Sequence, residues 1–449
     1  PELVERKDTK DQVADVVVRV NEGDQYKVGR IEFEGNDRTM DKVLRRELRL
    51  QEGRVVSIGA VRNSITKVNQ LGYFKLDESD PVKIDYDGEN KQVNLVFKGE
   101  EAERTELQFG GGWSEFEDFF GQFAINTKNF LGRGEQVGVS LQAGGIRDVL
   151  DVSYFIPWFM DRPQSLGFRA FDQELDYDIF TAIGTQRTRT TSRGGTITYG
   201  RNLGLFQQMS ASYNRTLYED EARILGGTGG TLFSRLEIDT SSVRPIYVYD
   251  SRDNPFEPTR GRRLTLATEY AGGFLGGDSY FVRPELTFSL FQPLGTPVRQ
   301  VFAFNVEAGL VDPFEGRELT RLERFYLGGE NSIRGHRSRS ITVRDPRTGE
   351  RLIDENQILL GGDRYLQVNL EYHFLLGGPF RILLFADAAQ VYGDDQSFDL
   401  SRLRYTAGAE LRVLVPVFGA PLRFIYAFNL DEQPGDQFED FQFSIGTSF

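Results

Sequence analysis

The sequence predicts a transmembrane antiparallel β-barrel of about 16 strands, preceded by a small α/β domain. Apolar and polar side chains alternate over long stretches of residues 106–449. These segments run about 9–12 residues, the length that a tilted strand needs to cross a bilayer, whereas strands of soluble sheets are typically about 5–6 residues long. Helix signals are confined to residues 1–105, and glycine and aromatic residues become dense only after Gly110.

The composition argues against several kinds of site. The 449 residues carry 53 Lys and Arg against 67 Asp and Glu, a net charge of −14, so we expect no nucleic-acid partner. Cysteine is absent and there are only two histidines, which excludes disulfides, thiol catalysis and a His-rich metal site. We therefore expect no metal and no cofactor. Neither histidine has an obvious serine partner, so we also expect no enzymatic activity.

Residues 25–102 predict one small α/β domain. Its strands cover residues 28–34, 82–86 and 92–97, and two helices follow the capping residues Thr39 and Ser57. The first helix presents one apolar face, made of Met40, Val43, Leu44 and Leu48. An earlier strand over residues 13–20 cannot bury itself alone, so we expect residues 1–24 to be the end of a preceding domain of a longer protein.

Residues 103–449 predict the barrel. In residues 366–374, for example, every second side chain is apolar and the others include Glu371 and His373. Full charges on one face suit a water-filled lumen and are costly against lipid, which favours a membrane barrel over a soluble sandwich. The predicted strands are 106–114, 118–129, 135–143, 147–156, 164–176, 185–199, 205–220, 232–249, 261–274, 280–294, 300–312, 363–376, 380–392, 402–415, 420–430 and 438–449. Residues 313–362 form one loop of about fifty residues, and a loop this long usually has a function.

That loop contains the segment FYLGGENSIRGHRSRSI, residues 325–341. Its core, Ile333, Arg334, Gly335 and His336, resembles the (V/I)-R-G-(F/Y) loop motif of the BamA superfamily of outer-membrane assembly and translocation barrels. The resemblance implies that the loop folds back into the lumen. His336 departs from the motif, because the family more often has an aromatic residue there.

Other segments carry the same resemblance. GGDRYLQVNLEYHFLL, residues 361–376, resembles the family's twelfth strand with its inward Glu371, and FADAAQVY, residues 385–392, resembles the thirteenth with Asp387. DSRDNPFEPTRG resembles the turn after strand eight. IEFEGNDRTMDKVLRREL and LGYF resemble the POTRA domain, the periplasmic module of the family, so residues 25–102 are identified as a POTRA domain.

Arg334 is the candidate that anchors the loop. A guanidinium inside a lumen favours a planar carboxylate partner, and Gly335 lets the backbone approach the wall. Glu371 and Asp387 are the candidate partners on the wall, and the resemblance implies the same pairing. The alternative is that Arg334 is one of several solvated loop arginines. In either case we expect a structural and not a catalytic role.

The seam between the first and last strands is the second candidate site. Glycine weakens a strand and permits distortion, although the simplest alternative is that these glycines fit a crowded wall or a bend. The resemblance implies a lateral gate at this seam. The gate residues are Gly110, Gly111 and Gly112 in the first strand and Phe441, Phe443 and Phe449 in the last.

The resemblance implies the core insertase of the outer-membrane β-barrel assembly machinery, in a bacterial outer membrane with its POTRA domain in the periplasm. Expected partners are unfolded outer-membrane β-barrel clients, accessory assembly lipoproteins and outer-membrane lipids. A TamA-like assembly factor or a two-partner secretion polypeptide translocator remains the alternative. A passive porin would lack both the POTRA domain and the Arg334 loop.

Overall fold

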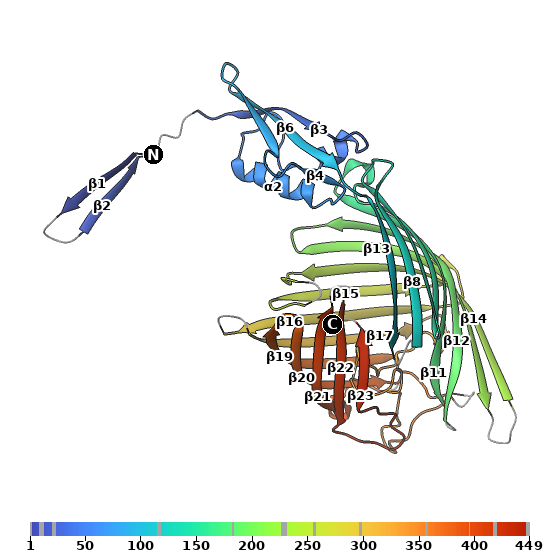
Figure 1. Cartoon of the computed structure of the whole chain (residues 1–449). Coiled ribbons are helices and arrows are strands. Elements are labelled where there is room, and N and C mark those ends of the chain that lie inside the picture. The colour runs from blue at the N-terminus through green and yellow to red at the C-terminus, as the bar shows by residue number, and fades with distance from the viewer. Residues whose placement is uncertain are drawn as a thin grey trace. The chain divides into compact units, whose positions relative to one another are not determined.

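Figure 1 shows the computed structural model of the chain. It describes residues 2–8, 13–19, 24–114, 118–181, 184–225, 231–254, 257–295, 299–354, 358–394, 396–415 and 420–445. The chain divides into two compact units, which are Pro1–Glu106 with Thr127–Glu135, and Leu107–Asn126 with Gln136–Phe449. None of the described helices is long and apolar enough to cross a membrane.

The first unit contains an α/β domain built around one central strand. The domain consists of β3 (Lys27–Glu34), α1 (Asp41–Arg45), α2 (Ile58–Asn69), β4 (Phe74–Leu76), β5 (Val82–Asp87) and β6 (Gln92–Glu101). The central strand β6 is parallel to β3 and antiparallel to β4 and β5. Alternate residues of β6, namely Val93, Leu95 and Phe97, are buried in the domain core. A separate hairpin of β1 (Glu2–Asp8) and β2 (Val13–Arg19) precedes the domain.

Two details of this domain differ from the sequence prediction. Ser57 caps α2 as predicted, since its hydroxyl accepts a bond of 3.4 Å from the Ala60 amide. Thr39 does not cap α1, because its hydroxyl instead donates to the Glu101 carboxylate. The helix is also shorter than expected, and Met40 is exposed instead of sharing the buried face.

The second unit contains the barrel sheet (Figure 1). Within the described residues it has 17 strands, one of them only two residues long. The strands are β7 (Thr105–Ser114), β8 (Asp118–Phe130), β9 (Glu135–Gly144), β10 (Arg147–Ile156), β11 (Gln164–Thr181), β12 (Gly184–Asn202), β13 (Gln207–Leu225), β14 (Thr231–Asp250), β15 (Gly261–Ala271), β16 (Phe281–Leu294), β17 (Gln300–Leu310), β18 (Asp312–Pro313), β19 (Arg364–Gly377), β20 (Phe380–Tyr392), β21 (Arg404–Val415), β22 (Ala420–Asn429) and β23 (Phe441–Ile445). The sixteen longer strands correspond one by one to the sixteen predicted.

Neighbouring strands of this sheet are antiparallel and follow chain order, with β17 pairing directly with β19 across the loop. The order also places β7 between β23 and β8, so the first and last strands are neighbours. The strand β19 illustrates why apolar and polar residues alternate: Leu370 is 39% exposed, whereas the adjacent Glu371 is only 1% exposed. The apolar face therefore points outward and the charged face points into the lumen.

Candidate functional site: the inward loop and its anchors

The loop between β18 and β19 packs on the inner wall of the barrel. Its residues Leu327, Ile333, Ile341 and Val343 form one buried cluster with wall residues of β19 and β20, namely Tyr365, Ala389 and Val391. Isolated bridges from Leu327 to Ile341 and from Phe325 to Gly362 hold the loop in a compact shape. These contacts bring the motif residues against the lumen face of the wall.

Arg334 lies at the centre of a buried charge cluster and is only 2% exposed. Its guanidinium binds Asp387 through two bonds, Nε to Oδ2 at 2.8 Å and Nη2 to Oδ1 at 2.6 Å. Its Nη1 donates to Glu371 at 2.7 Å. The backbone amide of Arg334 also donates to Asp387, at 3.0 Å. The structure thus brings Arg334 together with both carboxylates named from the sequence.

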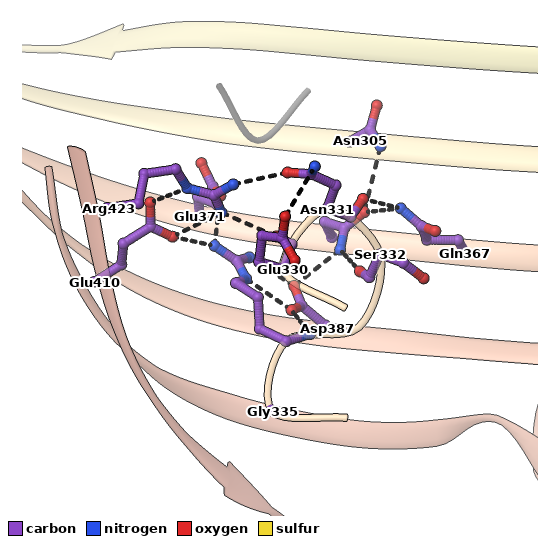
Figure 2. A network of polar contacts seen from close by, with 12 residues as sticks. Asn305, Glu330, Asn331, Ser332, Gly335, Gln367, Glu371, Asp387, Glu410 and Arg423 are labelled. Carbon is purple, nitrogen blue, oxygen red and sulfur yellow. Dashed lines mark hydrogen bonds and ion pairs between the residues drawn. The ribbon is translucent and has the colours of Figure 1, made fainter. Parts of the chain in front are cut away.

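The cluster contains three further charged residues that sequence reasoning did not assign to it, Glu410, Arg412 and Arg423, and Figure 2 shows Glu410 and Arg423. Glu410 of β21 accepts from Arg334 at 3.0 Å, from Arg412 at 2.6 Å and from Arg423 at 2.7 Å. Arg412 also donates to Glu371, at 3.0 Å. Three guanidinium groups therefore meet three carboxylates, and such mutual compensation makes burial of the charges tolerable.

Amide side chains extend the cluster along the loop (Figure 2). Asn369 donates to the carbonyl of Ser332 at 2.7 Å and to Asp387 at 2.9 Å. Arg423 donates to the side chain of Asn331 at 2.8 Å. The loop backbone is thus held by the same network that holds the Arg334 guanidinium.

The other half of the motif contacts the last strand. The amide of Gly335 donates to the side-chain oxygen of Gln442 in β23 at 2.8 Å, and Gln442 donates back to the His336 carbonyl at 3.3 Å. Gly335 has φ +89°, and a Cβ atom there would lie 2.4 Å from the ring of Phe438. Only glycine allows this approach. The loop tip therefore joins the charge cluster of β19–β21 to β23.

His336 fills the position where an aromatic residue was expected. It is 1% exposed, and its ring meets the ring of Phe438 edge to face at 5.2 Å. Burial, together with the nearby Arg404 guanidinium, lowers the pKa of His336 to about 4. The imidazole is therefore neutral near pH 7 and packs as an aromatic ring.

Except for Phe449, the predicted gate residues lie in the first and last strands of the sheet. Gly110 lies in β7, and a Cβ atom there would meet nothing within 4 Å. Gly111 and Gly112 lie in the same strand. In β23, Phe441 is 53% exposed, and the Phe443 ring contacts that of Phe424 in a tilted arrangement with the ring centres 5.1 Å apart. Phe449 lies outside the described residues.

Comparison with known proteins decides the family. Residues 129–449 match the family model described as the Omp85 superfamily domain. The chain belongs to the Omp85 superfamily. Residues 26–102 match a POTRA model, described as surface antigen variable number repeat. The predicted combination of a POTRA domain and an antiparallel barrel is therefore confirmed.

Two curated relatives match almost the whole chain and a third matches most of it. It is 29% identical to the outer membrane protein assembly factor BamA of Nitratidesulfovibrio vulgaris, over 99% of this chain and 54% of that protein. It is 26% identical to BamA of Neisseria meningitidis, over 98% of this chain and 58% of that protein. The chain thus spans about half the length of these relatives. Sorting and assembly machinery component 50 homolog of Mus musculus is 26% identical over 72% of this chain and 69% of that protein.

Solved structures show the same superfamily fold. The crystal structure of BamA from Haemophilus ducreyi lacking POTRA domains 1–3 superposes with a TM-score of 0.78 at 22% identity, and the match covers 99% of this chain and 89% of that one. CdiB from Acinetobacter baumannii gives a TM-score of 0.55 at 14% identity, covering 94% of this chain and 74% of that one. The fold is therefore shared by BamA and by CdiB.

Proposed function

We propose that this chain is the membrane part of an outer-membrane β-barrel assembly factor that inserts client strands at the seam between β7 and β23. The relatives support this proposal, because two are outer membrane protein assembly factors and a third is a sorting and assembly machinery component homolog. The observation that supports insertion at this seam is a difference in the side-chain contacts of β7 and β23. The last strand is tied to the inward loop through Gln442. Among the described residues, the side-chain bonds of β7 instead join it to β8, between Thr105 and Thr127 and from Lys128 to Glu106.

This asymmetry favours β7 as the strand that separates. Opening β23 would break the bonds between Gln442 and the loop tip, whereas the described residues of β7 make no side-chain bond to the loop. The consecutive glycines of β7, from Gly110 to Gly112, weaken its strand pairing because they offer no side chains to pack. An opened β7 presents a row of unpaired backbone donors and acceptors, which is a template for another strand.

A client strand would then add to β7 by main-chain hydrogen bonds, which require no particular sequence. The bilayer interior penalises each unpaired backbone group by several kcal/mol. A template that pairs each new strand before it meets lipid removes that penalty. Insertion would proceed without covalent chemistry and without a cofactor.

The proposed function also implies where the protein lies in the cell and which molecules it contacts. The barrel would lie in a bacterial outer membrane and the POTRA domain in the periplasm. Clients would be unfolded outer-membrane β-barrel proteins, and accessory lipoproteins and membrane lipids would assist.

Single cysteines test the route of the client, because the chain has none of its own. One variant carries Gly110→Cys in β7 and another carries Ser192→Cys, whose position lines a cavity in the lumen. The matched control is Gly121→Cys in β8, where a Cβ atom also meets nothing within 4 Å. Each variant meets a stalled barrel client with one cysteine in its last strand, and disulfide crosslinks are measured.

Crosslinking at Gly110 in clear excess over Gly121 is the expected result. Crosslinking mainly at Ser192 would mean that the chain passes through the lumen, and the translocator alternative would replace the insertase. Equal crosslinking at Gly110 and Gly121 would contradict a specific seam.

A further inference from the structure

A cavity of about 460 Å³ lies in the lumen, away from the Arg334 cluster. Its wall side is built by strands β11–β16, with Leu175, Ile238 and Phe281 as apolar lining. Its other side is built by the inward loop, which contributes Ser338 and Arg339. A volume of this size lies in the range of small-molecule sites, which are typically about 300–1,000 Å³.

Arg339 is held in an unusual arrangement at the edge of this cavity. Its guanidinium carbon lies 4.7 Å from the ring centre of Tyr177 and 4.1 Å from that of Tyr326. Its backbone has φ +60°, a left-handed conformation that costs about 1–2 kcal/mol for a residue with a Cβ atom. Stacking between two rings fixes the plane of the guanidinium. It leaves the N–H groups free to donate, because they point outward within that plane.

Those N–H groups are not used by the described part of the protein. Among the described residues, Arg339 has ring contacts but no hydrogen-bond or ion-pair partner. Arg283, on the opposite wall of the same cavity, differs. Its guanidinium donates to the Glu323 carbonyl at 2.5 Å and lies 3.6 Å from the Glu269 carboxylate. The cavity is therefore lined by two different guanidinium groups. That of Arg283 is paired with protein acceptors, whereas that of Arg339 has no acceptor among the described residues.

We propose that this cavity binds an oxyanion that carries an apolar or aromatic group. A guanidinium presents paired N–H donors that match the paired oxygens of a carboxylate or a phosphate. With the oxyanion on Arg339, the apolar body would lie along Leu175, Ile238 and Phe281. Hydroxyl groups of the lining, such as those of Ser192 and Ser338, supply further donors.

Binding of this ligand class does not depend on the proposed assembly function. It requires only the cavity and the orientation of Arg339, so either proposal can fail alone. The ligand in a cell would be a carboxylate or a phosphate ester, and the two sources share the chemistry that Arg339 recognises.

The test uses water-soluble probes, which do not partition into micelles as long-chain amphiphiles do. The refolded full chain in zwitterionic detergent is titrated with N-acetylphenylalanine, with phenyl phosphate and with the neutral N-acetylphenylalanine amide. Binding is measured by calorimetry and by saturation-transfer NMR. We expect at least one of the two anions to bind at least tenfold more tightly than the amide.

Variants assign that binding to the cavity. Arg339→Gln is expected to weaken binding of the anion at least tenfold. The matched control is Arg337→Gln, which removes a loop arginine that pairs with Glu439 at 2.8 Å, and it should leave binding unchanged. Ile238→Trp reduces the cavity volume and keeps Arg339 in the chain, and it should weaken each anion that binds the parent chain at least tenfold even if Arg339→Gln fails to fold.

Three results would overturn the proposal. The first is that neither anion binds the parent chain. The second is that the amide binds as tightly as the acid. The third is that Arg337→Gln loses as much affinity as a folded Arg339→Gln. A preference between the two anions identifies the source of the ligand and supports the site in either case.

Discussion

The side-chain amide of Asn129 donates a 2.7 Å hydrogen bond to the hydroxyl of Thr39, and this bond docks the turn between β8 and β9 on the α/β domain. Both residues are buried, with exposed fractions of 0% and 2%. The Thr39 hydroxyl donates onward to Glu101 at 3.0 Å, and the Asn129 side-chain oxygen accepts from the Gly134 amide at 2.8 Å. The turn belongs to the same compact unit as the α/β domain.

The glycines of this turn make the docking possible. Gly132 has φ +73°, and a Cβ atom there would lie 2.0 Å from the Arg38 carbonyl oxygen. Gly134 is also confined, because a Cβ atom would lie 2.4 Å from the Arg46 guanidinium and 2.9 Å from a methyl group of Val43. The Gly132 carbonyl accepts from the Met40 amide at 3.0 Å. Backbone approaches backbone here, so larger residues would force the two surfaces apart.

Asn129→Ala is expected to loosen this docking. The change removes two buried hydrogen bonds and leaves the Gly134 amide without its acceptor, which costs about 1–3 kcal/mol. The left-handed backbone at residue 129, φ +56°, adds a further penalty for alanine. Exchange of the Gly134 and Met40 amides, measured by mass spectrometry, should accelerate about 10- to 100-fold.

The control for this prediction is Asn90→Ala. Asn90 also bonds through its side chain, to Asp87 at 2.8 Å, but the contact is exposed. Its loss should leave the exchange of Gly134 unchanged. If Asn129→Ala also leaves that exchange unchanged, the turn is held by packing alone.

The contacts of Thr39 are a part of the fold that could not be predicted from the sequence. A threonine before an amphipathic segment ordinarily caps the helix, and the alternation of β strands is equally local, so both are visible in sequence. The real partners of Thr39 are Glu101 and Asn129, which lie 62 and 90 positions away. No local pattern contains those contacts. The strand periods were therefore predictable, and the use of the Thr39 hydroxyl was not.

Arg334→Gln is expected to release the loop from the wall. It leaves the buried Asp387 carboxylate without its guanidinium and leaves Glu371 with that of Arg412 alone, and breaking a buried ion pair costs about 3–5 kcal/mol. A reporter cysteine at Ser340, which is 2% exposed, measures the release by its maleimide labelling rate. The rate should rise at least about 100-fold.

Arg337→Gln is the matched control for that prediction. The Arg337 side chain is 40% exposed, and surface ion pairs contribute only about 0–1 kcal/mol. Labelling at residue 340 should therefore stay near the parent rate. Equal labelling of the two variants would show that the charge cluster does not anchor the loop.

The charge cluster was only half visible in the sequence. Arg334, Glu371 and Asp387 stood out by motif resemblance and by their inward positions. Glu410 and Arg412 also occupy inward positions, but their assignment depends on the register in which Leu383 faces Glu410. Gln442 joins the site only because the loop folds back onto β23. Register and loop folding are long-range properties, and residue spacing does not specify them.

Gly335→Ala separates packing from backbone strain at the loop tip. Gly349 lies in the same loop with φ +73° and has nothing within 4 Å of a Cβ position, so Gly349→Ala reports backbone strain alone, about 1–2 kcal/mol. At Gly335 the new methyl group also meets Phe438, and such overpacking adds about 1–3 kcal/mol. Urea unfolding in lipid vesicles should therefore rank Gly335→Ala as the more destabilised variant.

Phe438→Ala checks the cause of that difference. In the double variant the ring is gone, so the two costs should fall short of additivity by more than about 1 kcal/mol. Strict additivity would place the effect of Gly335→Ala elsewhere than on Phe438.

His336 predicts a dependence of stability on pH. Its pKa is about 4 in the folded chain against an ordinary value of 6.5, so between these values the unfolded chain binds more protons than the folded one. Stability should therefore be complete above about pH 6.5 and fall as the pH drops towards 4, by at most about 1.4 kcal/mol per pH unit. The groups around the imidazole are Arg404, Asp436, Arg351 and Asp431.

His336→Phe isolates this contribution, since phenylalanine keeps the edge-to-face contact with Phe438 and cannot take up a proton. The difference in unfolding free energy between parent and variant should be constant above about pH 6.5 and shift in favour of the variant below it. A difference that stays constant down to pH 4.5 would mean that the imidazole titrates equally in both states. In that case its burial beside Arg404 does not penalise the charged form, and the histidine would act at the loop tip only through its shape.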